Sequence, residues 1–307
     1  MSEQHDIAPS QNNTLRTGIE TPVLLTAALF LVLVWGSAFT LIGVAVRTIS
    51  PEWLVAYRMT FGAGLVLAYC LMKGYRLPPI KDGRWAWYLS MGLTGASLPF
   101  VLIAVGQKTV DSGLTAILVG TMPLMTVVLA HIFTDEKLNF WKSLGFVLGF
   151  FGIIILFLPT EISLDLVSDW KAQLLILGAA FCYASTTIIA ARAPETPSAV
   201  GAAMMLLAGA AMSMIWAIGT AGPAPIPDLT VIICILVLGI GSTGIATVTY
   251  LWLIDEVGPS VIAKINYLVP ICSVILGVTF LSEPLDWRIF VSLAVIILGL
   301  MIARKGR

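Results

Sequence analysis

Ten apolar stretches, each about 20 residues long, follow one another along the sequence and constrain the fold more than any other feature. A helix needs about 20 mostly apolar residues to cross the hydrocarbon core of a bilayer, which is about 30 Å thick. Strict alternation of apolar and polar residues is absent, which argues against a membrane β-barrel. The sequence therefore predicts an all-α integral membrane protein with ten transmembrane helices. Their approximate bounds are 24–46, 53–72, 85–105, 112–133, 140–158, 172–191, 198–219, 229–253, 260–281 and 287–303.

The composition agrees with a chain embedded in lipid. Of the 307 residues, 58% are hydrophobic and only 11% are charged, whereas about a quarter of the residues in soluble domains are charged. Seventeen basic and seventeen acidic residues cancel, which argues against a nucleic-acid partner. The four cysteines lie within apolar stretches and form no CxxC pair, so we expect packing residues, no metal site and no cofactor.

The distribution of lysine and arginine predicts the orientation. With the N-terminus inside, eleven of the seventeen basic residues lie on the cytoplasmic side and four lie on the opposite side. Basic residues concentrate in cytoplasmic loops. We therefore expect both termini in the cytoplasm, with residues 1–22 as a disordered tail and residues 304–307 as a basic tail.

The chain also contains an internal repeat. Shifting residues 89–152 by 147 positions aligns them without a gap to residues 236–299, with twelve identities among sixty-four positions. Proline and glutamate carry the most weight, because a mid-span proline precedes a loop glutamate by thirteen residues in each half. The matched residues are Pro123 with Pro270 and Glu136 with Glu283.

This repeat predicts two units of five spans, residues 23–158 and 171–303, joined by a periplasmic linker at 159–170. An odd number of spans makes the second unit enter the membrane from the opposite side. The two units are then inverted relative to each other, with N-terminus and C-terminus both inside. That arrangement is typical of secondary transporters, whose substrate site lies near the membrane midplane between the repeats.

Several of these residues resemble a known family. Trp35-Gly36-Ser37-Ala38-Phe39 in the first span, Arg58 in the second, and Pro123 with Glu136 around the fourth resemble the EamA-type repeat of the drug/metabolite transporter superfamily. Pro270 and Glu283 fit the second copy, in which Phe181-Cys182-Tyr183-Ala184-Ser185 replaces the tryptophan-containing run. The resemblance covers about 24–303. Within the superfamily, the sequence is most similar to the YddG-type bacterial exporters.

The resemblance implies a secondary transporter in the bacterial inner membrane that exports aromatic and other neutral amino acids, or related metabolites, by alternating access. Its partners would be this small-molecule substrate and the lipid bilayer, with the protein a monomer or a weak dimer. A metabolite or nucleotide-sugar exchanger is the alternative within the superfamily. An intramembrane enzyme is a distant alternative, because it would need a buried nucleophile with a base, an acid pair or metal ligands, and the spans carry none of these.

The positions of the acidic residues restrict the substrate further. All seventeen aspartates and glutamates fall in tails, loops or span ends. A buried carboxylate is the expected partner of a cationic drug and the usual proton carrier of an antiporter. The sequence therefore argues against a cationic substrate and favours a facilitator without proton coupling.

Charged, aromatic and hydroxyl residues within the spans are candidates for substrate contact. Lys264 lies four residues after Ser260, where it could either face a cavity or extend to the cytoplasmic interface. Tyr267 shares its helical face and favours the cavity, where the ammonium would meet a substrate carboxylate. Interhelical packing is the alternative role for the other candidates, which are Trp35, Phe39, Ser97, Tyr183, Thr243 and Tyr250.

The remaining candidates have structural or gating roles. We hypothesise that Pro123 and Pro270 kink their spans and give bendable ends for opening on one side at a time. For Arg58, a bridge to loop acids or backbone carbonyls is favoured over substrate contact. Glu136 and Glu283 lie in or beside loops, which favours capping or packing. Gly145, Gly149 and Gly152 are interpreted as a close helix-packing face.

Overall fold

The computed structural model describes residues 21–79, 81–134, 138–157, 169–257, 266 and 268–305. Three predicted site residues, Glu136, Lys264 and Tyr267, lie outside these ranges, as do most of the N-terminal tail and of the linker. All regular structure in the described ranges is helical. The elements are α1 (Thr21–Ala45), α2 (Pro51–Met72), α3 (Trp85–Gly92), η1 (Leu93–Ser97), α4 (Leu98–Gly106), α5 (Ser112–Val119), α6 (Met122–Phe133), α7 (Phe140–Phe157), α8 (Asp169–Arg192), α9 (Ser198–Ala221), α10 (Leu229–Leu236), η3 (Val237–Ile245), α11 (Ala246–Val257), α13 (Leu268–Leu281) and α14 (Trp287–Arg304).

Consecutive elements join into long apolar helices. Within the described residues, eight helices are long and apolar enough to cross a membrane, and two shorter apolar helices cover Phe140–Ile155 and Leu268–Leu281. The prediction of an all-α, membrane-embedded protein is confirmed. The two shorter helices fall where spans five and nine were predicted, so the number of ten spans stays a prediction.

The ends of the helices follow local sequence signals. Ser50 accepts a hydrogen bond from the amide of Trp53 at 3.4 Å, and Pro51 begins α2 where its missing N–H costs nothing. Asp228 caps α10 in the same way, at 2.9 Å from the amide of Val231. Gly222 ends α9 with a positive φ of 74°, which glycine adopts more readily than other residues. The breaks between spans are therefore encoded locally.

An ion pair fixes the loop between α2 and α3. Oδ2 of Asp82 lies 2.7 Å from Nη2 of Arg84. Nη1 of Arg84 also donates a hydrogen bond to Oγ1 of Thr196, in the loop after α8, at 3.2 Å. The hydrogen bonds from Arg84 lower the pKa of the Asp82 carboxyl to about 2. The aspartate therefore stays ionised at any pH near neutrality, and the pair joins the two loops.

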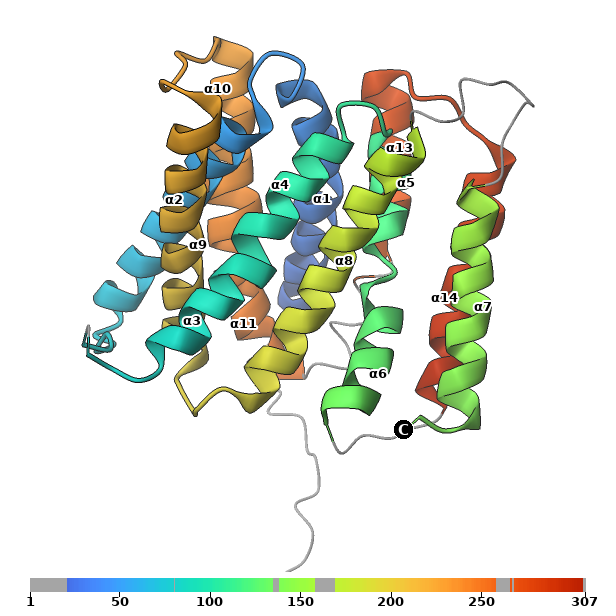
Figure 1. The fold of residues 1–307 in the computed structure, drawn as a ribbon, viewed down its shortest axis with the longest axis horizontal. Helices are drawn as coiled ribbons and strands as arrows, with labels where there is room; N and C mark the ends of the chain where they lie inside the picture. The colour runs from blue at the N-terminus through green and yellow to red at the C-terminus, as the bar shows by residue number, and fades with distance from the viewer. Residues whose placement is uncertain are drawn as a thin grey trace, which may run out of the picture.

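The helices run roughly side by side, with α7 and α14 as a pair at one edge (Figure 1). Helix α2 packs against α9 and against η3 in the interior of the bundle. The contact with η3 is close, because a Cβ atom on Gly62 would lie 2.5 Å from Cγ2 of Thr243. On the other side, a Cβ atom on Gly209 of α9 would lie 3.0 Å from Cβ of Ala96 in η1. Gly209 lies 147 positions after Gly62, and Ala96 lies 147 positions before Thr243. The internal repeat therefore relates the two contacts to each other.

The predicted glycine face of α7 is confirmed. A Cβ atom on Gly152 would lie 2.6 Å from a side-chain carbon of Ile296 in α14. In the reverse direction, a Cβ atom on Gly299 would lie 2.6 Å from the carbonyl oxygen of Gly145 and 2.7 Å from the amide nitrogen of Gly149. Small residues allow such close backbone approach between membrane helices.

Candidate binding site around Arg58

Two π-helical segments lie within the long helices, η1 in the third predicted span and η3 in the eighth. Such segments are rare and occur frequently at functional sites. In η3, the hydroxyl of Ser242 donates a hydrogen bond to the carbonyl oxygen of Val34 at 2.9 Å. The indole N–H of Trp35 donates one to the carbonyl oxygen of Ser242 at 3.2 Å. These two bonds attach η3 to α1, while the next residue, Thr243, contacts α2.

Arg58 is a charged residue buried inside the bundle, with 7% of its surface exposed. It lies on α2, where its Nε–H donates a hydrogen bond to Oγ1 of Thr243 at 3.0 Å. Its guanidinium carbon lies 3.9 Å from the centroid of the Phe100 ring of α4, in a cation–π contact. Three helices thus meet at this side chain.

The partners of Arg58 differ from the expectation of loop acids or backbone carbonyls. Among the described residues, a hydroxyl and an aromatic ring contact the guanidinium, and no carboxylate pairs with it. A buried ion loses several kcal/mol of hydration. A hydrogen bond to a charged group contributes about 1.5–3 kcal/mol of stability, and a desolvated cation–π contact contributes about 2 kcal/mol. Together these two contacts offset much of the lost hydration. The rotation of α2, which the sequence does not reveal, turns Arg58 toward the interior.

A second aromatic ring lies behind that of Phe100. The ring of Tyr183 on α8 lies 6.4 Å from that of Phe100 in an edge-on arrangement, and Tyr183 is close enough to Arg58 for an electrostatic interaction. The structure therefore brings two predicted site residues, Tyr183 and Thr243, together with Arg58. Phe100 was missed, because nothing in the sequence distinguishes it from the other phenylalanines.

A second aromatic pair lies next to the first group. The rings of Trp35 on α1 and Tyr250 on α11 are 5.7 Å apart, and both side chains are half-buried. Phe39, one turn after Trp35, packs against the hydrophobic core that contains α2. These three predicted residues thus lie on helices that adjoin η3 or α2.

Ser97 occupies a different environment from the other predicted site residues. Its side chain is fully buried, and its hydroxyl accepts a hydrogen bond from the hydroxyl of Ser213 at 2.8 Å. This bond joins η1 to α9. The geometry favours a packing role for this hydroxyl.

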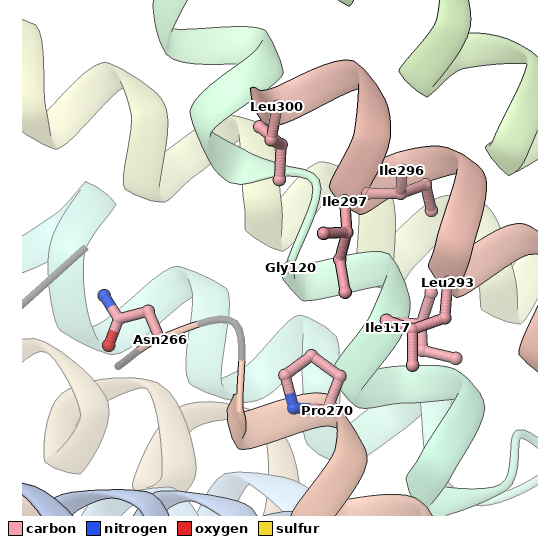
Figure 2. Close-up of a pocket in the computed structure, with 8 residues that line it drawn as sticks. All are labelled: Ile117, Gly120, Asn266, Pro270, Leu293, Ile296, Ile297 and Leu300. Atoms are coloured by element: carbon pink, nitrogen blue, oxygen red, sulfur yellow. The ribbon is translucent and has the colours of Figure 1, made fainter. Parts of the chain in front are cut away.

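The two prolines lie near the starts of the described helices α6 and α13. Helix α5 ends at Val119 and α6 begins at Met122, so the break falls immediately before Pro123. Helix α13 begins at Leu268, two residues before Pro270. Pro270 borders a mostly apolar pocket between α5, α13 and α14, whose lining is shown in Figure 2. The lining residues are Ile117, Gly120, Asn266, Pro270, Leu293, Ile296, Ile297 and Leu300.

Glu283 joins the two halves of the chain. Its carboxylate accepts hydrogen bonds from the amide and hydroxyl of Ser112, at 2.7 and 3.0 Å, and from the amide of Gly113 at 3.2 Å. Glu283 follows α13, whereas Ser112 begins α5. A carboxylate at this position satisfies free amides at the start of a helix and interacts favourably with its dipole.

Removing this carboxylate should destabilise the protein. We expect Glu283→Ala to lower the free energy of unfolding by about 1–2 kcal/mol, because α5 loses its cap. The midpoint of thermal unfolding in detergent measures the effect. Glu195→Ala, which removes an exposed loop carboxylate, is the matched control. Equal midpoints for the two variants would contradict a capping role.

These observations define a helical membrane protein with a mixed polar and aromatic group of residues at its centre. The model of the EamA-like transporter family matches residues 22–158 and, a second time, residues 170–304. The chain therefore belongs to the EamA-like transporter family, and it is a membrane transporter of the drug/metabolite transporter superfamily. Membership in a family of transporters is consistent with the expectation that the protein is not an enzyme.

Similar proteins occur in Escherichia coli and Bacillus subtilis. The chain is 27% identical to an uncharacterized inner membrane transporter of Escherichia coli K12, YedA, over 92% of this chain and 91% of that protein. It is 25% identical to an uncharacterized transporter of Bacillus subtilis, YoaV, over 87% of this chain and 92% of that protein. A crystal structure of another protein matches 92% of the chain with a TM-score of 0.65 and 21% identity, which shows a shared fold.

Proposed function

We propose that the protein is a secondary carrier that exports neutral amino acids with aromatic or other apolar side chains, or related metabolites, across the cell inner membrane. Transport would proceed by alternating access and without coupling to protons. The membrane is proposed from the similarity to YedA, which is named as an inner membrane transporter.

The observation that carries this proposal is the composition of the group around Arg58. A cation, a hydroxyl and two rings come together there from α2, η3, α4 and α8. Small-molecule sites are mostly apolar with a few placed polar groups. A positive centre among rings suits a substrate with a carboxylate and an apolar side chain, and it disfavours cationic drugs.

Two other features restrict the substrate and its coupling. Within the described residues, Arg58 is the one buried lysine or arginine, whereas a phosphate-bearing metabolite would favour several cations. No aspartate or glutamate lies at mid-span in the sequence. A membrane carrier that exchanges protons usually uses such a carboxylate. We therefore favour a facilitator driven by the substrate gradient.

The proposed mechanism rests on two inverted halves, residues 23–158 and 171–303. The matching contacts of Gly62 with Thr243 and of Gly209 with Ala96 support this arrangement, because an inverted repeat places α2 on η3 and α9 on η1 in the same way. Five spans in each half would place both termini on the same side of the membrane, and the distribution of lysine and arginine favours the cytoplasmic side.

Gating is proposed at Pro123 and Pro270. The break between α5 and α6 would let the end of span four bend independently of the rest, and Pro270 is proposed to do the same in span nine. Tyr183, Thr243, Trp35, Phe39 and Tyr250 are the proposed lining of the pathway.

Transport by the purified protein in liposomes tests the proposed function. We expect liposomes preloaded with tryptophan to exchange it for labelled tryptophan or methionine, with threonine slower and a cationic dye excluded. Collapse of a pH gradient with an ionophore should leave the rate unchanged. Uptake of the dye would contradict the proposed substrate class. A transport rate that follows the pH gradient would contradict the proposed uncoupled mechanism.

A further inference from the structure

The guanidinium of Arg58 keeps most of its hydrogen-bonding capacity within the described residues. A guanidinium carries five N–H donors, and the bond to Thr243 uses only the one on Nε. The two terminal nitrogens make no hydrogen bond to a described residue. They form a planar fork whose geometry matches both oxygens of a carboxylate.

The repeat shows that the scaffold does not need a charge at this place. The residue 147 positions after Arg58 is Met205, which lies against η1, 3.3 Å from the Cβ position of Gly95. The residue 147 positions before Thr243 is Ala96. The residues at the corresponding places in the other half are thus a methionine and an alanine, which carry no charge and no hydroxyl. The cation and the hydroxyl are specific to one half, although the packing is common to both.

The surroundings of the fork indicate what kind of molecule it binds. Phe100 presents an aromatic ring beside the guanidinium, and Tyr183 packs edge-on against Phe100. Trp35, which pairs with Tyr250, is hydrogen-bonded to η3 at Ser242. Rings of this kind bind an apolar or aromatic group. A buried guanidinium with unused donors is a favourable partner for an anionic group such as a carboxylate.

We propose that Arg58 binds the carboxylate of the cargo, with Thr243 holding the guanidinium in position and Phe100 and Tyr183 contacting the apolar side chain. The ligand class is a monocarboxylate with an aromatic or apolar substituent. This inference rests on the proposed function for the identity of the cargo. It differs from the sequence-based hypothesis, which gave the carboxylate to Lys264.

Binding of two matched ligands to the purified protein in detergent tests the inference. Phenylpropionate and phenylpropionamide have the same shape, but only the first carries a carboxylate. For the wild-type protein, we expect phenylpropionate to raise the midpoint of thermal unfolding at concentrations at least about tenfold lower than those the amide requires. A tenfold difference in affinity corresponds to about 1.4 kcal/mol of binding free energy. An absence of this preference in the wild-type protein would overturn the inference without any variant.

Variants of Arg58 assign the preference to this residue. Arg58→Met introduces the residue found at the corresponding place in the other half and should remove the preference for phenylpropionate. Arg58→Lys keeps the charge but loses the fork, so we expect an intermediate preference. Lys73→Met, which removes an exposed cation from the end of α2, should keep the wild-type preference. A full preference in Arg58→Met would overturn the inference.

The transport assay distinguishes this inference from the proposed function. If phenylpropionate binds through Arg58 but liposomes transport no amino acid, the carboxylate site stands and the proposed function fails. If amino acids are transported by the wild-type protein and by Arg58→Met with the same KM, the proposed function stands and the carboxylate site fails.

Discussion

Adding one carbon atom at Gly62 should abolish transport. A Cβ atom there would lie 2.5 Å from Cγ2 of Thr243 and 3.1 Å from the carbonyl oxygen of Gly239, so α2 and η3 must separate in Gly62→Ala. Arg58 lies one helical turn before Gly62, on the same face of α2. The separation therefore pulls the guanidinium away from Thr243, to which it now donates at 3.0 Å. We expect exchange of labelled tryptophan in liposomes to fall to the level of liposomes without protein.

Gly64 provides the matched control on the same helix. A Cβ atom on Gly64 meets nothing within 4 Å, so Gly64→Ala should transport at the wild-type rate. Alanine favours a helix over glycine by about 0.8–1.0 kcal/mol, so intrinsic helix propensity cannot explain a loss in Gly62→Ala. The double variant Gly62→Ala/Thr243→Ser removes the clashing methyl group, keeps the hydroxyl and should recover part of the activity. Wild-type transport by Gly62→Ala would show that the contact between α2 and η3 does not hold the site.

Much of the architecture could be predicted because the membrane imposes a length on each span. Charges, prolines and glycines gather in the breaks between the apolar stretches, so these breaks mark where most helices end. The seventh span, predicted at 198–219, is helix Ser198–Ala221, and the second, predicted at 53–72, is Pro51–Met72. The glycines of α7 could be recognised from their spacing alone. These features depend on local sequence and on helical periodicity.

The site itself could be predicted only in part, because it depends on which faces of the helices meet. Thr243 and Tyr183 were selected as polar and aromatic residues within spans. The contacts of Arg58 were not predicted, because its distance from the end of the span does not reveal the rotation of α2. Gly62 is one of 27 glycines, and its close contact becomes visible only when η3 is placed beside it. The π-helical segments follow from tertiary packing and leave no recognisable sequence signal.

A large residue at Gly145 should separate α7 from α14 and leave little folded protein. A Cβ atom there would lie 2.6 Å from Cβ of Ala303 and closer still to the carbonyl oxygen of Gly299. In lipid, apolar surface gains nothing from leaving the bilayer, so close packing must hold the two helices together. We expect Gly145→Leu to lower the free energy of unfolding by about 3 kcal/mol, at the upper end for an overpacked contact. Size-exclusion chromatography after solubilisation and the thermal unfolding midpoint measure this loss.

Leucine itself is well tolerated in a membrane helix, so the effect must come from the lost approach of two backbones. Gly201 on α9 tests this point, because a Cβ atom there meets nothing within 4 Å, and Gly201→Leu should elute and unfold like the wild type.

The contact between α7 and α14 is also reciprocal, since a Cβ atom on Gly299 would lie 2.6 Å from the carbonyl oxygen of Gly145. Gly299→Leu should therefore cause a loss of similar size. The double variant should lose less than the sum of the two, because both substitutions break one interface. Losses that simply add would mean that α7 and α14 are held by separate contacts.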